Sequence, residues 1–133
     1  MKNQHYEPVK AIFGTLRGRD AILLGHLSFN PIGNVLTIQG DVNGNLSTTP
    51  GYKNQIVDFV FTCSEVLAYT LVDSEIHGDD GTSCFDEVIG SKWLEKLGQD
   101  KSKYKHFVMT YYDHTLDVIC DRYSLDLVGI KER

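Results

Sequence analysis

The feature that most constrains the fold is an alternation of apolar and polar residues in short segments that are separated by turns. In residues 36–42 and 57–63, apolar side chains occupy every second position except at Gly40, and polar side chains fill most of the gaps. A period of two is typical of a β-strand with one face on a core and one face in water. Turn residues such as Pro31 and Gly33 separate the first of these segments from an earlier predicted strand at residues 21–29. Connections this short favour antiparallel pairing, because a parallel crossover needs about a dozen residues or more.

We therefore predict an α+β, mainly β fold. The expected architecture is an antiparallel sheet or sandwich of about seven or eight strands with one amphipathic helix near residues 83–98. The chain of 133 residues is long enough for one domain with its own core, and we expect that single domain to span residues 1–133. Residues 43–54 contain little to bury, which predicts a mobile loop within the domain.

The helix prediction rests on a change of period after residue 83. Apolar residues then follow helical spacing, at Phe85, Val88, Ile89, Trp93, Leu94 and Leu97. Ser83 with Asp86 resembles an N-terminal capping box, and Gly98 provides a stop. Gly90 and Ser91 are the weak point, where the helix could be interrupted and capped again at Ser91. We expect Trp93 and Leu97 to share a core with Phe59 and Phe61.

Charge and composition exclude several classes of function. Eighteen acidic and 13 basic residues give a net charge of −5, which argues against nonspecific binding to nucleic acid or to anionic lipid. The longest apolar run is shorter than the roughly 20 residues of a membrane helix, and the first residues do not resemble a secretory leader. Three widely spaced cysteines are typical of reduced thiols. These features predict a small acidic protein of the cytoplasm.

The sequence contains no recognisable metal or catalytic spacing. No two of the five histidines have the i, i+4 spacing of a zinc hydrolase, and no Cys-x-x-Cys pair occurs. We interpret the acidic loop at residues 77–81 as solvated rather than as a calcium site. Cys63, Cys84 and Cys120 are expected to be small buried hydrophobes. We therefore expect no metal and no cofactor. A nucleophile pair of Cys84 or Cys120 with His106 or His114 stays an open alternative.

The last predicted hairpin carries the candidate binding surface. Carboxylates and tyrosines gather there, and the predicted partner-binding residues are Tyr111, Tyr112, Asp113, Asp117 and Asp121. Along this strand Asp117 and Asp121 point to one face, opposite Leu116 and Val118. An acidic row with tyrosines suits a basic protein partner, because complementary charge steers encounter and tyrosine anchors interfaces. The competing interpretation is an ordinary wet sheet face.

Residues 83–120 resemble a pattern in small uncharacterised bacterial domains, some of which are thought to be immunity proteins of toxin systems. The resemblance rests on Ser83-Cys84-Phe85-Asp86-Glu87-Val88-Ile89 with Ser91, Trp93 and Leu94, and on His106-Phe107, Tyr112-Asp113 and Asp117-Val118-Ile119. It implies a protein that occludes a partner, and it carries no catalytic residue to this chain.

Three functional hypotheses follow. The first is a non-catalytic protein-binding module, immunity-like, that places an acidic sheet face on a basic partner. The second is a small-ligand-binding protein or minor enzyme with a pocket between the sheet and the helix. The third is a domain that associates with a second copy of itself through an unpaired edge strand. Acidity, the missing catalytic spacing and the resemblance favour the first.

Overall fold

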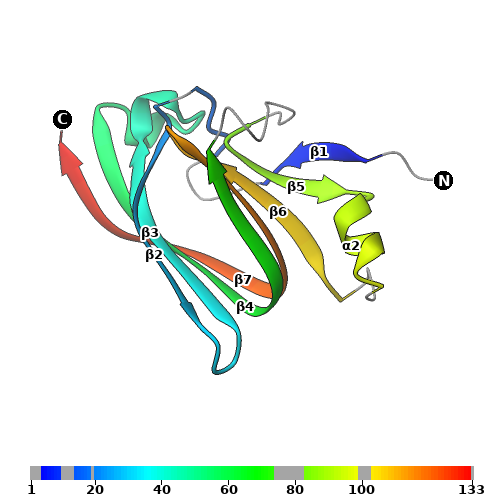
Figure 1. The fold of residues 1–133 in the computed structure, drawn as a ribbon. Coiled ribbons are helices and arrows are strands. Elements are labelled where there is room, and N and C mark those ends of the chain that lie inside the picture. Colours follow the sequence, from blue (N-terminus) through cyan, green and yellow to red (C-terminus); the bar gives the residue numbers. More distant parts are fainter. Residues whose placement is uncertain (1–3, 10–13, 19, 74–82, 99–102, 133) are drawn as a thin grey trace.

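The structure is a computed structural model that describes residues 4–9, 14–18, 20–73, 83–98 and 103–132. Within these ranges, seven strands form one antiparallel sheet in the order β1-β5-β6-β7-β4-β3-β2 (Figure 1). The strands are β1 (His5–Pro8), β2 (Ile22–Asn30), β3 (Val35–Asn43), β4 (Gln55–Asp73), β5 (Phe85–Ile89), β6 (Lys105–Thr110) and β7 (His114–Glu132). One short helix, α2 (Lys92–Lys96), follows β5, and 3₁₀ turns span Gly44–Leu46 and Pro50–Tyr52. The predicted mainly β, antiparallel architecture is confirmed.

Two long bent strands, β4 and β7, organise the sheet. In Figure 1 they run together, bend together and then continue in a new direction. The bend in β4 lies at Glu65, whose φ of 54° is in the left-handed region, and the pairing with β7 shifts register just beyond it. The sequence segments 57–63 and 66–72 therefore belong to one strand instead of two, and the same holds for 116–120 and 125–130.

The bend divides the sheet into two half-sheets. The first half-sheet contains β2, β3, residues 55–63 of β4 and residues 122–132 of β7. The second contains residues 66–73 of β4, residues 114–120 of β7, and β6, β5 and β1. β6 pairs with β7 only as far as Cys120. Among the described strands, β7 is therefore paired on both edges in the second half-sheet and on one edge in the first. The reverse holds for β4.

The main core lies between the two half-sheets. The ring of Phe61, in the first half-sheet, meets Phe85 and Phe107 of the second edge-on at centroid distances of 5.1 and 6.4 Å. The buried cluster comprises Leu16, Ala21, Ile22, Leu36, Ile38, Val42, Val57, Phe59, Phe61, Cys63, Val66, Cys84, Phe85, Phe107, Met109, Tyr111, Leu116, Val118 and Cys120. Folding the sheet over itself lets one sheet provide both sides of a core.

The predicted helix near residues 83–98 is wrong in its first half. Residues 85–89 form strand β5, and its neighbours on either side are β1 and β6. Pairing and burial on both faces outweigh the helical spacing of a short apolar run, which periodicity alone cannot resolve. The Ser83–Asp86 contact exists, with Ser83 Oγ donating to Asp86 Oδ1 at 2.6 Å, but it stabilises the entry to a strand.

The second half of that segment is helical but short. Gly90, with φ of 69°, ends β5, and Ser91 caps α2, as the interrupted-helix alternative anticipated. The expected common core is also wrong in part. Phe59 and Phe61 lie in the main core, whereas Trp93 is half-buried outside it and Leu97 is exposed. A helix of five residues covers only part of a sheet face.

The loop at residues 43–54 packs against the domain through its two 3₁₀ turns. Leu46 and Tyr52 are half-buried against the main core. Asn45 Oδ1 accepts a hydrogen bond from the Asn54 backbone N–H at 2.7 Å, which closes the loop.

Candidate functional site

The structure does not bring the predicted partner-binding residues together on one exposed face. Tyr112 and Asp113 are exposed at the turn between β6 and β7. Asp121 is half-buried on β7, just beyond the last residue that pairs with β6. Tyr111 and Asp117 are buried, with exposed fractions of 1% and 8%. The prediction of an exposed surface of carboxylates and tyrosines is therefore wrong for Tyr111 and Asp117.

Tyr111 is buried because the chain turns inward before β7. Its ring belongs to the main core, and its hydroxyl has no hydrogen-bond partner in the part of the chain that the structure describes. Burial raises the pKa of this hydroxyl, with a smaller contribution from Cys63. Tyr111 is thus a core residue.

Asp117 is buried because the second half-sheet is covered on both faces. Register places His106 opposite Ile119 and Val108 opposite Asp117, so these four residues share the face that points away from the main core. Val88 and Leu94 are also buried outside the main core. The start of β7 is consequently buried on both faces, which alternation along a single strand does not reveal.

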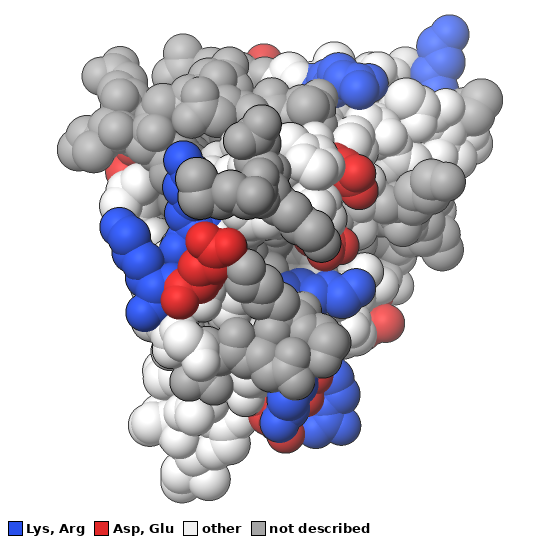
Figure 2. Space-filling model, turned by 90° about the vertical axis from the view of Figure 1, so that its right-hand side faces the viewer, with Lys and Arg blue, Asp and Glu red and all other residues white. Residues whose placement is uncertain are grey.

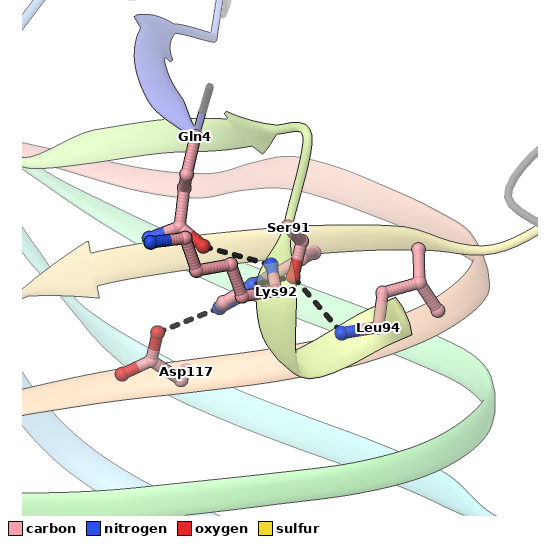
Figure 3. Close-up of polar contacts among 6 residues, drawn as sticks. Gln4, Ser91, Lys92, Leu94 and Asp117 are labelled. Atoms are coloured by element: carbon pink, nitrogen blue, oxygen red, sulfur yellow. Dashed lines mark hydrogen bonds and ion pairs between the residues drawn. The ribbon is translucent and has the colours of Figure 1, made fainter. Parts of the chain in front are cut away.

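A chain of hydrogen bonds crosses this second buried face. The Ser91 side-chain oxygen lies 2.7 Å from His106 Nδ1, and His106 Nε2 lies 2.7 Å from Asp117 Oδ1. Ser91, His106 and Asp117 expose only 3%, 6% and 8% of their surface. We call these three residues the polar chain. It joins the start of α2 to β6 and β7 (Figure 3).

The chemistry of the groups sets the direction of these hydrogen bonds. The Asp117 carboxylate accepts, so Nε2 of His106 carries the proton that faces it. In the neutral ring Nδ1 is then the acceptor for the Ser91 hydroxyl. The Ser91 oxygen itself accepts from the Leu94 backbone N–H at 3.1 Å, the usual bond of a helix N-cap. Every group in the polar chain therefore has a partner.

Further contacts fix the start of α2. Gln4 Oε1 accepts a hydrogen bond from the Lys92 backbone N–H at 2.9 Å (Figure 3). The Trp93 ring meets the His106 ring edge-on, with centroids 5.4 Å apart. Two of the backbone N–H groups that a helix start leaves without internal partners are thus satisfied by side chains.

The polar chain has the residue types of a Ser-His-Asp nucleophile but not its setting. A nucleophilic serine needs an oxygen that can reach a carbonyl carbon, with donors placed for the developing oxyanion. Here the Ser91 oxygen caps α2, and Ser91 is almost fully buried. What this arrangement does is hold α2 in one position on the sheet, since an unpaired buried polar group costs about 1–3 kcal/mol.

The thiols are positioned as buried residues. A hydrogen bond between Cys63 and Cys120 raises the pKa of Cys63, and burial raises it further. Cys84 Sγ donates to the Gly18 carbonyl at 3.2 Å. A raised pKa disfavours the thiolate, which is the nucleophile and metal ligand. The ring nitrogens of His106 bond to Ser91 and Asp117, which is not the arrangement of a Cys–His pair.

Metal-binding side chains are not clustered in the described part of the chain. Among those residues, no group of three His, Cys, Asp or Glu side chains could hold a metal ion. The acidic loop at residues 77–81 lies outside the described residues. On the side of the molecule shown in Figure 2, the acidic and basic side chains of the described residues are interspersed.

The second half of β7 presents a different kind of site, a strand edge that has no pairing partner among the described strands. From Arg122 to Glu132 this strand pairs with β4, and no other strand in the described ranges pairs with its second edge. We call residues 122–132 the β7 edge. A free edge presents unpaired backbone N–H and C=O groups, which are able to accept another strand.

The β7 edge also leaves part of the core face uncovered. Ile130 lies opposite Val57 and shares its face, yet Ile130 is 56% exposed and Val57 is fully buried. Leu125 and Leu127 lie opposite Phe61 and Phe59 and are only half-buried against the same core. The core therefore extends to this edge, which no strand of the described ranges covers.

Two other long edges occur among the described strands: residues 66–73 of β4, which pair only with β7, and β2. The β2 edge is better covered than the β7 edge. Ile22 is fully buried, and Leu24, Leu27 and Phe29 are half-buried against the core. The Phe29 ring lies 5.3 Å from Tyr69 of the second half-sheet, which closes over this end of β2. The β7 edge, where Val128 and Ile130 are 62% and 56% exposed, is thus more open than the β2 edge, where Leu23 is 50% exposed.

Comparison with known proteins adds no relative. The sequence matches no family model, and it has no significant match among curated proteins or among solved structures. In the ranges that the structure describes, no helix is long and apolar enough to cross a membrane.

Proposed function

We propose that this protein is a non-catalytic protein-binding module that takes up an extended segment of a partner protein along the β7 edge. The observation that carries the proposal is the difference in exposure between paired residues of β4 and β7 on the core face. Val57 is fully buried, whereas Ile130, its cross-strand neighbour on the same face, is 56% exposed. A strand added beside β7 would cover this face and continue the core.

Strand addition makes use of both exposed features of the β7 edge. Main-chain hydrogen bonds to the free edge would provide affinity, and side chains that alternate between the two faces would provide specificity. The apolar groups of Ile130 and of the half-buried Leu125 and Leu127 would leave water. Burial of apolar surface contributes about 25 cal/mol per Å².

Two further observations support a binding function over catalysis. The polar chain has a structural role at the start of α2, because the Ser91 oxygen accepts the hydrogen bond of the helix N-cap. The thiols are buried, and the raised pKa of Cys63 disfavours a thiolate. The resemblance of residues 83–120 to domains thought to include toxin-immunity proteins supports the same class of function, in which a small protein occludes a partner.

The experiment is a selection from a displayed library of random peptides, followed by amide hydrogen exchange of the protein with a recovered peptide. We expect the peptide to slow exchange along residues 122–130. The double variant Val128→Lys, Ile130→Lys should weaken binding by about tenfold or more, since about 1.4 kcal/mol corresponds to tenfold. Inward or edge lysines are the device by which natural edge strands resist pairing.

The matched control is Leu23→Lys on β2, because Leu23 is also an exposed apolar residue on an edge strand. This variant should bind as the native protein does. Failure to recover any peptide that protects residues 122–130, or loss of binding in the Leu23 variant alone, would contradict the proposal.

A further inference from the structure

We infer that the partner segment alternates basic and apolar residues, and this inference rests on the proposed function. We call the face of the first half-sheet that points away from the main core the outer face. The basic side chains of the segment would lie over the outer face beside Asp126 and Asp58, and its apolar side chains would lie on the core face beside Leu125 and Leu127. The inference follows from which side chains occupy the two faces of the sheet next to the β7 edge.

Two neighbouring rows of the outer face next to this edge are acidic. Asp126 is exposed on β7 and lies opposite Val60, so it points away from the core. One row along, Gly129 lies opposite Asp58, which in turn lies opposite Asp41 on β3. Carboxylates therefore occupy two successive rows of the outer face. Side chains of an added strand would continue these rows, because cross-strand neighbours share a face.

Gly129 opens a path from the edge to Asp58. A Cβ at this position would lie 3.1 Å from Asp58 Oδ2, so a larger residue would crowd that carboxylate. Because Gly129 has no side chain, position 129 itself places nothing between the Asp58 carboxylate and a side chain on an added strand. Lysine and arginine are long enough to lie across one strand spacing of about 4.8 Å.

A bulge sets the spacing of the two basic positions. The pairing of β7 with β4 shifts register between Asp58 and Phe59, which makes Val128 an extra residue on β7. Asp126 and Gly129 are three apart in sequence but lie opposite Val60 and Asp58, which are two apart. Two basic residues separated by one apolar residue on the added strand would therefore match both rows.

The opposite face of the same edge is apolar. Leu125 and Leu127 are half-buried against the core, and Ile130 is exposed on that face. The residues of the partner that alternate with the basic ones would pack here. The net charge of −5 favours approach of such a segment, since complementary charge raises the association rate.

Arg122 limits how far the basic pattern extends. It lies opposite Ser64 on the outer face, and its side chain is 72% exposed, with one nitrogen 3.4 Å from a Glu65 oxygen. A basic residue beside Arg122 would face a like charge, which is unfavourable between neighbouring strands. The preferred segment is therefore basic only near Asp126 and Gly129.

The test uses three synthetic peptides of equal length: one that alternates valine and lysine, one that alternates valine and glutamate, and one with the valine and lysine residues in blocks. We expect the alternating lysine peptide to bind about tenfold tighter than either of the others and to protect residues 122–130 from hydrogen exchange. Added salt should reduce this preference, because exposed charges are screened beyond about 8–10 Å.

Charge reversal sharpens the test. Asp126→Lys should shift the preference to the glutamate peptide, whereas Asp113→Lys, an equal change at the distant β6–β7 turn, should not. Equal binding of the lysine and glutamate peptides, or an unchanged preference in the Asp126 variant, would overturn this inference and leave the proposed function intact. Protection of residues 122–130 that appears with rising protein concentration alone would also overturn it, because the occupant would then be a second copy. If no peptide protects these residues, the proposed function fails as well.

Discussion

The two halves of β7 have opposite environments although they belong to one strand. Residues 115–120 pair with β6 on one side and β4 on the other, and all of them are buried. Residues 122–132 pair only with β4 among the described strands, and several of their apolar side chains are exposed. A bend near Cys120 separates the two environments. One strand can therefore anchor a domain with its first half and offer a binding edge with its second.

The polar groups of the two halves differ in the same way. In the first half Asp117 is buried and bonded to His106, whose other nitrogen contacts Ser91. In the second half Asp126 is exposed on the outer face. The same residue type thus has a structural role in one half and is available for recognition in the other. Burial, not residue type, distinguishes these roles.

The largest expected effect is on the buried half. His106→Ala should lower the free energy of unfolding by about 2–3 kcal/mol, because it removes a hydrogen-bond partner from each of the buried Ser91 and Asp117 side chains. Urea unfolding monitored by circular dichroism measures this change. His26→Ala is the matched control, since His26 is exposed on β2, and it should change stability by about 0.5 kcal/mol or less. Equal stability of the two variants would contradict a structural role for the polar chain.

A smaller effect is expected at the cap of α2. Ser91→Ala should cost about 1 kcal/mol, the usual cost of losing an N-cap side chain. The change should speed hydrogen exchange at the Leu94 amide, which Ser91 accepts from. Ser91→Thr keeps the hydroxyl and should retain more of the protection. If the alanine and threonine variants exchange alike, the hydroxyl is not what fixes the helix.

The smallest effect on stability is expected at the β7 edge. Ile130→Lys should change the free energy of unfolding by about 0.5 kcal/mol or less, because the side chain is already 56% exposed. Ile32→Lys, at the exposed turn between β2 and β3, serves as the control for adding a surface charge. A loss of several kcal/mol in the Ile130 variant alone would indicate that this edge is covered in solution.

The sequence predicted the class of fold but not the register that creates the sites. Alternation in residues 36–42 and 57–63 correctly indicated antiparallel strands on a core. Helical spacing from Phe85 was misleading, because the three apolar residues of a five-residue segment are too few to define a period, and its pairing partners β1 and β6 lie elsewhere in the sequence. The cap at Ser91 was foreseen from its position after Gly90.

The polar chain and the β7 edge could not be predicted for the same reason. His106 and Asp117 are 11 residues apart, and no spacing rule links positions on two strands until their register is known. An unpaired edge strand was among the hypotheses, but which edge is open depends on where β6 stops pairing with β7. Both features arise from the pairing of strands, which local patterns do not encode.

Hydrogen exchange of the free protein, measured amide by amide by NMR, tests the open edge most directly. We expect the amides of residues 115–120 to be protected throughout, since both edges of that half are paired. Along residues 122–130 we expect protected and fast-exchanging amides to alternate, because only those that face β4 are hydrogen-bonded. Uniform protection of residues 122–130 in dilute solution would contradict a free β7 edge and the binding function proposed for it.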